Sequence, residues 1–288
     1  MLRKFKKISK SARFYLWPAV AGNAIIVSLG VGAELIDALL LGSALCCLAS
    51  FGFLLNDLFD RRVDKANSAK RLEYADSSTL RGVWLAASLF LLAGLGCAAS
   101  VSLNCFGVCL WISLGLTLYS AVIRPVLLAA TLLSALLGTA PLWAPLILWH
   151  VRVLSPPVLT LFAGIYVMFV AREIILDIKD EKGDRVVGRH TFPTIYGGKT
   201  AGLLACFAKL AAGGVLIKAG FNLATTLPSL EGGLLLVLLA IFLYFGVLSA
   251  LQISLFSDSR EEISVYVLRS RVAMAILPFL LSIIFFSN

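Results

Sequence analysis

Residues 35–64 read LIDALLLGSALCCLASFGFLLNDLFDRRVD, and the stretch changes character at Asn56. Residues 35–55 are almost wholly apolar, whereas residues 56–64 carry three aspartates and an asparagine. A helix needs about 20 apolar residues to cross the hydrocarbon core of a bilayer. The stretch therefore predicts a membrane-spanning helix that ends in a cluster of oxygen-bearing side chains.

The composition of the whole chain indicates that its solvent is lipid. Of the 288 residues, 60% are hydrophobic and 14% are charged, and the mean hydropathy is +0.95. Water-soluble domains carry about 25% charged residues, and so much apolar side chain cannot be covered by polar surface. The six cysteines lie in apolar runs and form no CxxC pair, which argues against a disulfide framework or a zinc site.

Nine apolar runs are long enough to span a bilayer. Each is expected to be a helix, because backbone N–H and C=O groups in lipid must be satisfied within their own segment. We therefore predict an all-α fold, a single membrane domain over residues 1–288 with nine transmembrane helices around a central cavity. The predicted spans are 14–32, 35–55, 80–100, 104–122, 126–149, 157–176, 200–220, 232–255 and 263–286.

Basic residues predict the orientation in the membrane. Six of them precede or begin the first span: Arg3, Lys4, Lys6, Lys7, Lys10 and Arg13. Because Lys and Arg concentrate on the cytoplasmic side, we expect the amino terminus there, together with the segments after the second, fourth, sixth and eighth spans. The same rule accounts for the net charge of +9, so no nucleic-acid partner is expected. The prediction is an integral protein of the cell inner membrane, surrounded by membrane lipids.

Two aspartate triplets share one spacing, D-x-x-D-x-x-x-D. The first is Asp57, Asp60 and Asp64, and the second is Asp177, Asp180 and Asp184. On a continuous helix, offsets of zero, three and seven residues lie within about 60° of one another, so each triplet forms one carboxylate face. Both triplets follow spans on the cytoplasmic side, and they can therefore face each other across one cavity.

Like charges on one helix face repel each other, so such clusters need a cation. Carboxylate and amide oxygens, with no His or Cys nearby, favour Mg2+ or Ca2+. Asn56, four residues before Asp60, adds a neutral oxygen to the first face. Mg2+ usually takes one or two carboxylates and shares the rest of its shell with water and substrate phosphates.

Basic side chains surround both triplets: Arg61, Arg62, Lys65, Lys70, Arg71, Lys179, Lys182, Arg185 and Arg189. Carboxylates for the metal and Arg or Lys for phosphate oxygens together suit a magnesium diphosphate. Arg124 is the only charge between the fourth and fifth spans, and Tyr119 is near it in the sequence. A lipid cavity implies an isoprenoid tail, whose C–O cleavage leaves an allylic cation that the face of Tyr119 would stabilise.

The motifs resemble those of the UbiA superfamily of intramembrane prenyltransferases. Residues 56–64 are similar to the first aspartate-rich motif of that superfamily. The stretch REIILDIKDEKGDRVVGRHTFPTIYG, residues 172–197, is similar to the second, including a G-x-x-T-x-P pattern. The segment with Tyr119, Ser120 and Arg124 resembles the central loop of the family, and the count of nine helices agrees with the family architecture.

The resemblance implies Mg2+-dependent transfer of a polyprenyl group from an allylic polyprenyl diphosphate donor to an aromatic or lipid acceptor within the membrane. The residues implied for the metal-bridged diphosphate are Asn56, Asp60, Asp64, Asp180 and Asp184, with Asp57 and Asp177 in support; Asp60, Asp64, Asp180, Asp184 and Tyr119 are the predicted catalytic residues. The predicted diphosphate contacts are Asn56, Arg71, Arg124, Lys182 and Arg185, and the cavity is expected to include Arg13, Asn23 and Glu173.

Other functions remain open at this point. The same ionisation chemistry serves a UbiA-type terpene cyclase, and a related fold transfers phosphoribose to a polyprenyl phosphate. A non-enzymatic divalent-cation transporter would also carry carboxylates, although its acids are expected at mid-helix depth rather than on one side. After the first motif, many members continue N-K-x-x-R-P-L-x-x-G, whereas Arg71 is followed here by LEYAD, residues 72–76. This departure leaves the acceptor open.

Overall fold

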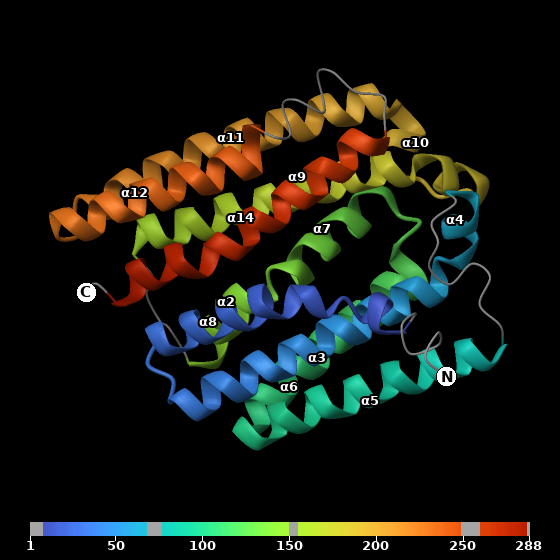
Figure 1. Ribbon diagram of the computed structural model, residues 1–288, viewed down its shortest axis with the longest axis horizontal. Helices are drawn as coiled ribbons and strands as arrows, with labels where there is room; N and C mark the ends of the chain where they lie inside the picture. Colours follow the sequence, from blue (N-terminus) through green and yellow to red (C-terminus); the bar gives the residue numbers. More distant parts are fainter. Residues whose placement is uncertain (1–7, 68–76, 150–154, 249–259, 287–288) are drawn as a thin grey trace.

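The computed structural model describes residues 8–67, 77–149, 155–248 and 260–286, and every regular element in these ranges is a helix (Figure 1). The all-α prediction is therefore confirmed. In chain order the elements are η1 (Phe14–Leu16), α2 (Trp17–Gly30), α3 (Leu35–Phe59), α4 (Arg61–Ala66), α5 (Ser77–Val101), α6 (Leu103–Leu118), η2 (Tyr119–Ile123), α7 (Leu127–Gly138), α8 (Ala140–Leu148), α9 (Pro156–Val186), α10 (Phe192–Tyr196), α11 (Gly198–Ala224), α12 (Ser229–Leu243), η3 (Tyr244–Leu248) and α14 (Arg260–Phe286).

Eight helical segments within the described ranges are long and apolar enough to cross a membrane, and α7 with α8 makes a ninth if the bent pair counts as one span. The predicted span 126–149 is thus wrong as a single helix, because the axis bends by 64° between α7 and α8. Pro141 explains the break: a proline lacks the N–H of the helical ladder, and its ring clashes with the preceding turn. The last part of the predicted span 232–255 lies outside the described residues.

The long helices run side by side along roughly one direction (Figure 1). Helix α9 packs on α11, α3 packs on α5, and α2 lies against both α3 and α14. The larger buried cluster joins α2, α9, α11, α12 and α14 through residues such as Leu161, Leu216 and Leu277, while a second cluster joins α3 and α6 through Leu48 and Ile112. The short helices α4 and α10 lie at the same end of the bundle, the end at which α3 finishes (Figure 1).

The two aspartate triplets differ in how the helices carry them. Helix α9 runs through to Val186, ten residues beyond the predicted end at 176, so the second triplet lies on one continuous helix. The first triplet does not, which corrects the prediction: α3 ends at Phe59, α4 begins at Arg61, and Asp60 is the joint between them. The bend at Asp60 lets α4 lie against α9.

The contact between α4 and α9 depends on Gly183. A Cβ atom at that position would lie 2.5 Å from Nδ2 of Asn67 and 2.7 Å from the backbone oxygen of Val63. Both distances are too short for a real Cβ, so only glycine lets the two segments approach this closely. The close approach brings the end of the first motif beside the second motif.

Candidate active site

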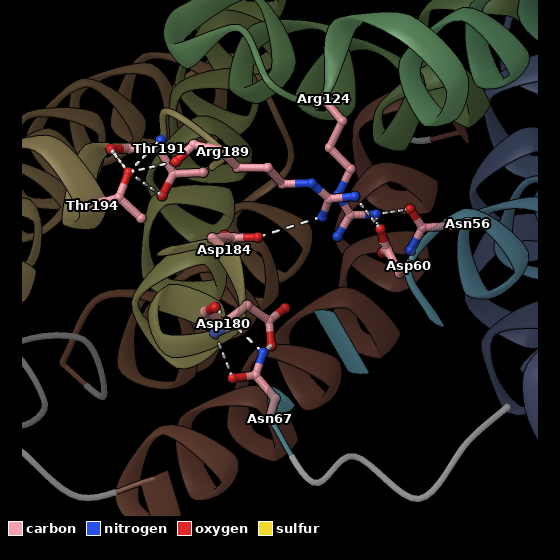
Figure 2. A network of polar contacts seen from close by, with 10 residues as sticks. Asn56, Asp60, Asn67, Arg124, Asp180, Asp184, Arg189, Thr191 and Thr194 are labelled. Carbon is pink, nitrogen blue, oxygen red and sulfur yellow. Dashed lines mark hydrogen bonds and ion pairs between the residues drawn. The ribbon is translucent and has the colours of Figure 1, made fainter. Parts of the chain in front are cut away.

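Arg124 joins the end of α3 to the start of the loop before α7. The π-helical turn η2 precedes it, and its backbone N–H donates to the carbonyl of Tyr119 at 3.1 Å. Its guanidinium donates to the amide oxygen of Asn56 and forms an ion pair with Asp60 (Figure 2). Turns of π-helix often mark functional sites, and here the turn directs the arginine toward the first aspartate motif.

Arg189 links the two motifs. Its Nη2 donates to Oδ1 of Asp60 at 2.7 Å, and its Nη1 lies 3.4 Å from Oδ1 of Asp184 (Figure 2). The side chains of Asp60 and Asp184 are only 3% and 4% exposed. Buried carboxylates need compensating charges. The guanidinium groups of Arg124 and Arg189 supply them, and both groups lie between the two motifs.

The chain places Arg189 through a tight turn after α9. Gly188 has a φ of +71°, a conformation that L side chains rarely adopt. Thr191 then caps α10 in a capping box with Thr194, whose hydroxyl also donates to the carbonyl of Arg189 at 2.9 Å. The backbone N–H of Arg189 donates to the carbonyl of Asp184 at 2.9 Å. The G-x-x-T-x-P pattern thus folds this arginine back over the second motif.

Asn67 ties the two motifs together on the other side. Its Oδ1 accepts the backbone N–H of Gly183 at 2.9 Å, and its Nδ2 donates to the backbone oxygen of Asp180 at 3.3 Å and to Oδ1 of that residue at 3.4 Å (Figure 2). Neither Asn67 nor Arg189 was among the predicted site residues. Sequence signals for both residues exist, since Asn67 begins the N-K-x-x-R-like segment and Arg189 lies within the G-x-x-T-x-P pattern.

A cavity of about 320 Å3, including the part open to the surroundings, lies beside the two arginines. Its lining residues are Tyr119, Arg124, Leu127, Ala130, Thr131, Ser134, Glu173, Asp177, Asp184, Arg189 and Thr191. The Arg124 guanidinium lies 5.7 Å from the centroid of the Tyr119 ring. Burial lowers the pKa of Arg124, but the neighbouring Tyr119 and Asp60 outweigh this and raise the pKa above its ordinary value. The arginine therefore stays charged.

Only one of the three residues that were expected to line the cavity is among its lining residues. Glu173 lines it, whereas Arg13 and Asn23 are not among its lining residues. Arg13 lies 3.4 Å from the fully buried Asp57 and stacks over the ring of Phe53 at 4.3 Å. Asn23 donates to the carbonyl of Ala19, within its own helix α2.

Two predicted diphosphate contacts lie elsewhere, and a third lies outside the described residues. Lys182 is exposed and is absent from the cavity lining. Arg185 is half exposed, and its Nη2 lies 2.8 Å from Oε1 of Glu181 and 3.3 Å from the backbone oxygen of Pro193. The reason is helical geometry: Arg185 follows Asp184 by one residue and so points about 100° away from it. Arg71 falls outside the described ranges.

The acidic residues do not form a closed metal cage. Within the part of the chain that the structure describes, no group of three or more His, Cys, Asp or Glu side chains is close enough to share one ion. The donor set nevertheless fits Mg2+, because it consists of carboxylate and amide oxygens around a cavity. Mg2+ needs only one or two protein carboxylates and completes its shell with water and substrate phosphates.

An all-helical membrane protein with two acidic motifs and two largely buried arginines between them has the features of an intramembrane prenyltransferase. The model of the UbiA prenyltransferase family matches residues 15–279. The digeranylgeranylglyceryl phosphate synthase of Thermococcus gammatolerans is 31% identical over 228 residues, covering 76% of this chain and 79% of that protein. The synthase of Thermococcus kodakarensis is 26% identical, with coverages of 77% and 80%.

Solved structures share the fold. A UbiA homolog from Archaeoglobus fulgidus bound to GPP and Mg2+ has a TM-score of 0.69 at 18% identity, over 96% of this chain and 99% of that chain. A structure of a digeranylgeranylglyceryl phosphate synthase has a TM-score of 0.63 at 20% identity, over 98% and 99%.

The chain belongs to the UbiA prenyltransferase family. It is a membrane-embedded prenyltransferase. The same matches do not favour a terpene cyclase, a phosphoribosyltransferase or a cation transporter.

Proposed function

We propose that this enzyme transfers a geranylgeranyl group from geranylgeranyl diphosphate to the free hydroxyl of a glyceryl phosphate lipid that already carries one such chain. The product would be digeranylgeranylglyceryl phosphate, the compound in the name of the relatives at 26–31% identity. The observation that carries the proposal is the position of Arg124 and Arg189 between Asp60 and Asp184, beside a cavity in an apolar helical bundle. That arrangement suits a charged head attached to an apolar tail.

The two arginines are the proposed diphosphate ligands. A guanidinium binds phosphate oxygens in the same forked geometry as it binds carboxylates. Arg124 and Arg189 can therefore replace their ion pairs with Asp60 and Asp184 by contacts with the diphosphate of the donor. The residues proposed for Mg2+ are Asn56, Asp60, Asp64, Asp180 and Asp184, with Asp57 and Asp177 in support. Mg2+ held by these residues would neutralise the negative charge on the diphosphate leaving group.

Tyr119 is proposed to stabilise positive charge on the donor carbon after the C–O bond breaks. Its ring lines the cavity and lies beside Arg124, where the diphosphate is proposed to bind. An aromatic face attracts a cation electrostatically. Leu127 and Ala130 contribute apolar side chains to the same lining, and exclusion of water would protect such a cation.

We propose that the mouth of the site faces the cytoplasm and that the whole chain acts as one domain in the inner membrane. Arg13, near the start of the described chain, lies 3.4 Å from Asp57 in the first motif. The six basic residues of the amino terminus favour a cytoplasmic position for that end.

The test uses the purified full-length protein in lipid vesicles with Mg2+ and labelled geranylgeranyl diphosphate. Three acceptors are compared: geranylgeranylglyceryl phosphate, homogentisate and 4-hydroxybenzoate. We expect a labelled ether lipid with the first acceptor alone, and no product after chelation of Mg2+. A prenylated aromatic product with no ether lipid would overturn the proposed acceptor, and a hydrocarbon formed without any acceptor would overturn transfer itself.

A further inference from the structure

The inner wall of the cavity carries a carboxylate that the proposed diphosphate site does not use. Glu173 lies on α9 four residues before Asp177 and eleven before Asp184, which is a helical rise of about 16 Å from Asp184. It lines the cavity together with Tyr119 and Ser134. It also lies within a membrane-spanning helix, where an ionisable side chain marks a functional site by default.

Two neighbouring side chains hold Glu173 in one position. The hydroxyl of Ser134, on α7, donates to Oε2 at 2.8 Å, and Nη1 of Arg172 donates to Oε1 at 2.6 Å. The guanidinium also balances the charge of a carboxylate that is only 15% exposed. Each oxygen of a carboxylate accepts about two hydrogen bonds, so each keeps capacity for a further donor. A carboxylate held in one position in this way can accept a hydrogen bond from the hydroxyl group of a ligand.

A lipid alcohol has that chemistry, whereas the diphosphate donor does not. A hydroxyl that is buried in the cavity without an acceptor would lose its hydrogen bond. The two other cavity carboxylates are nearer the charged end, and Asp184 already contacts Arg189. Of the three carboxylates that α9 contributes to the cavity lining, Glu173 is the farthest along the helix from Asp184, which contacts Arg189.

We propose that Glu173, held by Ser134 and Arg172, binds the hydroxyl of the lipid alcohol and turns its oxygen toward C1 of the prenyl donor. This inference rests on the proposed function. In the transfer the C1–O bond of the donor breaks, and its electron pair leaves with the diphosphate. A lone pair of the alcohol oxygen forms the new C1–O ether bond, while the hydroxyl proton passes along its hydrogen bond to Glu173 and is released with the products.

The test separates donor binding from transfer. Wild type, Glu173→Gln and Ser134→Ala are compared for Mg2+-dependent binding of the unreactive analogue geranylgeranyl thiodiphosphate, and for kcat and KM with geranylgeranylglyceryl phosphate. Glu181→Gln is the matched control, because it removes a carboxylate from the same helix at a position that pairs with Arg185 outside the cavity. Positioned proton acceptors contribute on the order of 100-fold or more to rate.

We expect Glu173→Gln to bind the analogue within twofold of wild type and to lose about 100-fold in kcat. Ser134→Ala should raise the KM for the alcohol several-fold with an unchanged donor KM, and Glu181→Gln should match wild type. A parallel loss of analogue binding in Glu173→Gln would assign this residue to the donor and overturn the inference. Full transfer activity in Glu173→Gln would overturn the inference alone, whereas a wild type that prenylates only an aromatic acceptor would overturn the proposed function as well.

Discussion

Gly183→Ala should separate the two aspartate motifs. The added Cβ would lie 2.7 Å from the backbone oxygen of Val63 and 2.5 Å from Nδ2 of Asn67. The Asn67 amide can rotate away, but the carbonyl belongs to the backbone of α4, so α4 itself must shift. Such overpacking costs about 1–3 kcal/mol, and weakening the buried bond from the Gly183 N–H to Asn67 costs about 1–3 kcal/mol more.

We therefore expect about 2–6 kcal/mol of destabilisation, part of which appears as weaker donor binding. The assays are thermal unfolding in detergent and Mg2+-dependent binding of geranylgeranyl thiodiphosphate. The Kd of the analogue should rise about tenfold for each 1.4 kcal/mol by which binding is weakened. Gly214→Ala is the matched control, because its Cβ would meet nothing within 4 Å. Wild-type melting and wild-type binding in Gly183→Ala would refute the dependence of the site on this contact.

Three further variants test the last turn of α9 and the segment that follows it. Arg189→Gln should weaken binding of the thiodiphosphate analogue by about tenfold or more, because charge-assisted bonds contribute about 1.5–3 kcal/mol; unchanged binding would remove this arginine from the donor site. Arg185→Gln should keep kcat and donor KM within twofold, since its guanidinium pairs with Glu181 outside the cavity; a large donor defect would restore the original prediction. Thr191→Val should lower the apparent melting temperature through loss of a cap of about 1 kcal/mol, and an unaltered melting curve would count against the cap.

The apolar runs predict where the helices lie, because lipid leaves a spanning segment no other way to satisfy its backbone. The D-x-x-D-x-x-x-D spacing likewise finds both acidic motifs, since it is a property of the local sequence. The second triplet lies on one helix as expected, through Asp184. The bend at Asp60 was not predictable in the same way, because it follows from packing of α4 on Gly183, which is 123 residues further along the chain.

The positions of Arg185 and Arg189 show that the number of nearby charges does not predict which basic side chains contact the acidic motifs. Charge counting nominates Arg185, although the 100° step from Asp184 already directs that side chain away from the acidic face. It places Arg189 among the bases near the second triplet but does not single it out as a diphosphate contact, because its approach to Asp60 depends on the positive φ of Gly188 and the cap at Thr191. The direction of a side chain after a turn depends on backbone geometry that composition does not contain.

Asp60 and Asp184 are proposed to hold a Mg2+-bound diphosphate together with Arg124 and Arg189. The most direct measurement is calorimetric titration of geranylgeranyl thiodiphosphate into wild type, Asp60→Asn and Asp184→Asn, each with Mg2+ and with EDTA. Asp37→Asn, at the other end of α3, is the control for an Asp-to-Asn change on the same helix. We predict Mg2+-dependent binding in wild type and in Asp37→Asn, and loss of that dependence in the two site variants; an unchanged Mg2+ dependence in both site variants would contradict the claim.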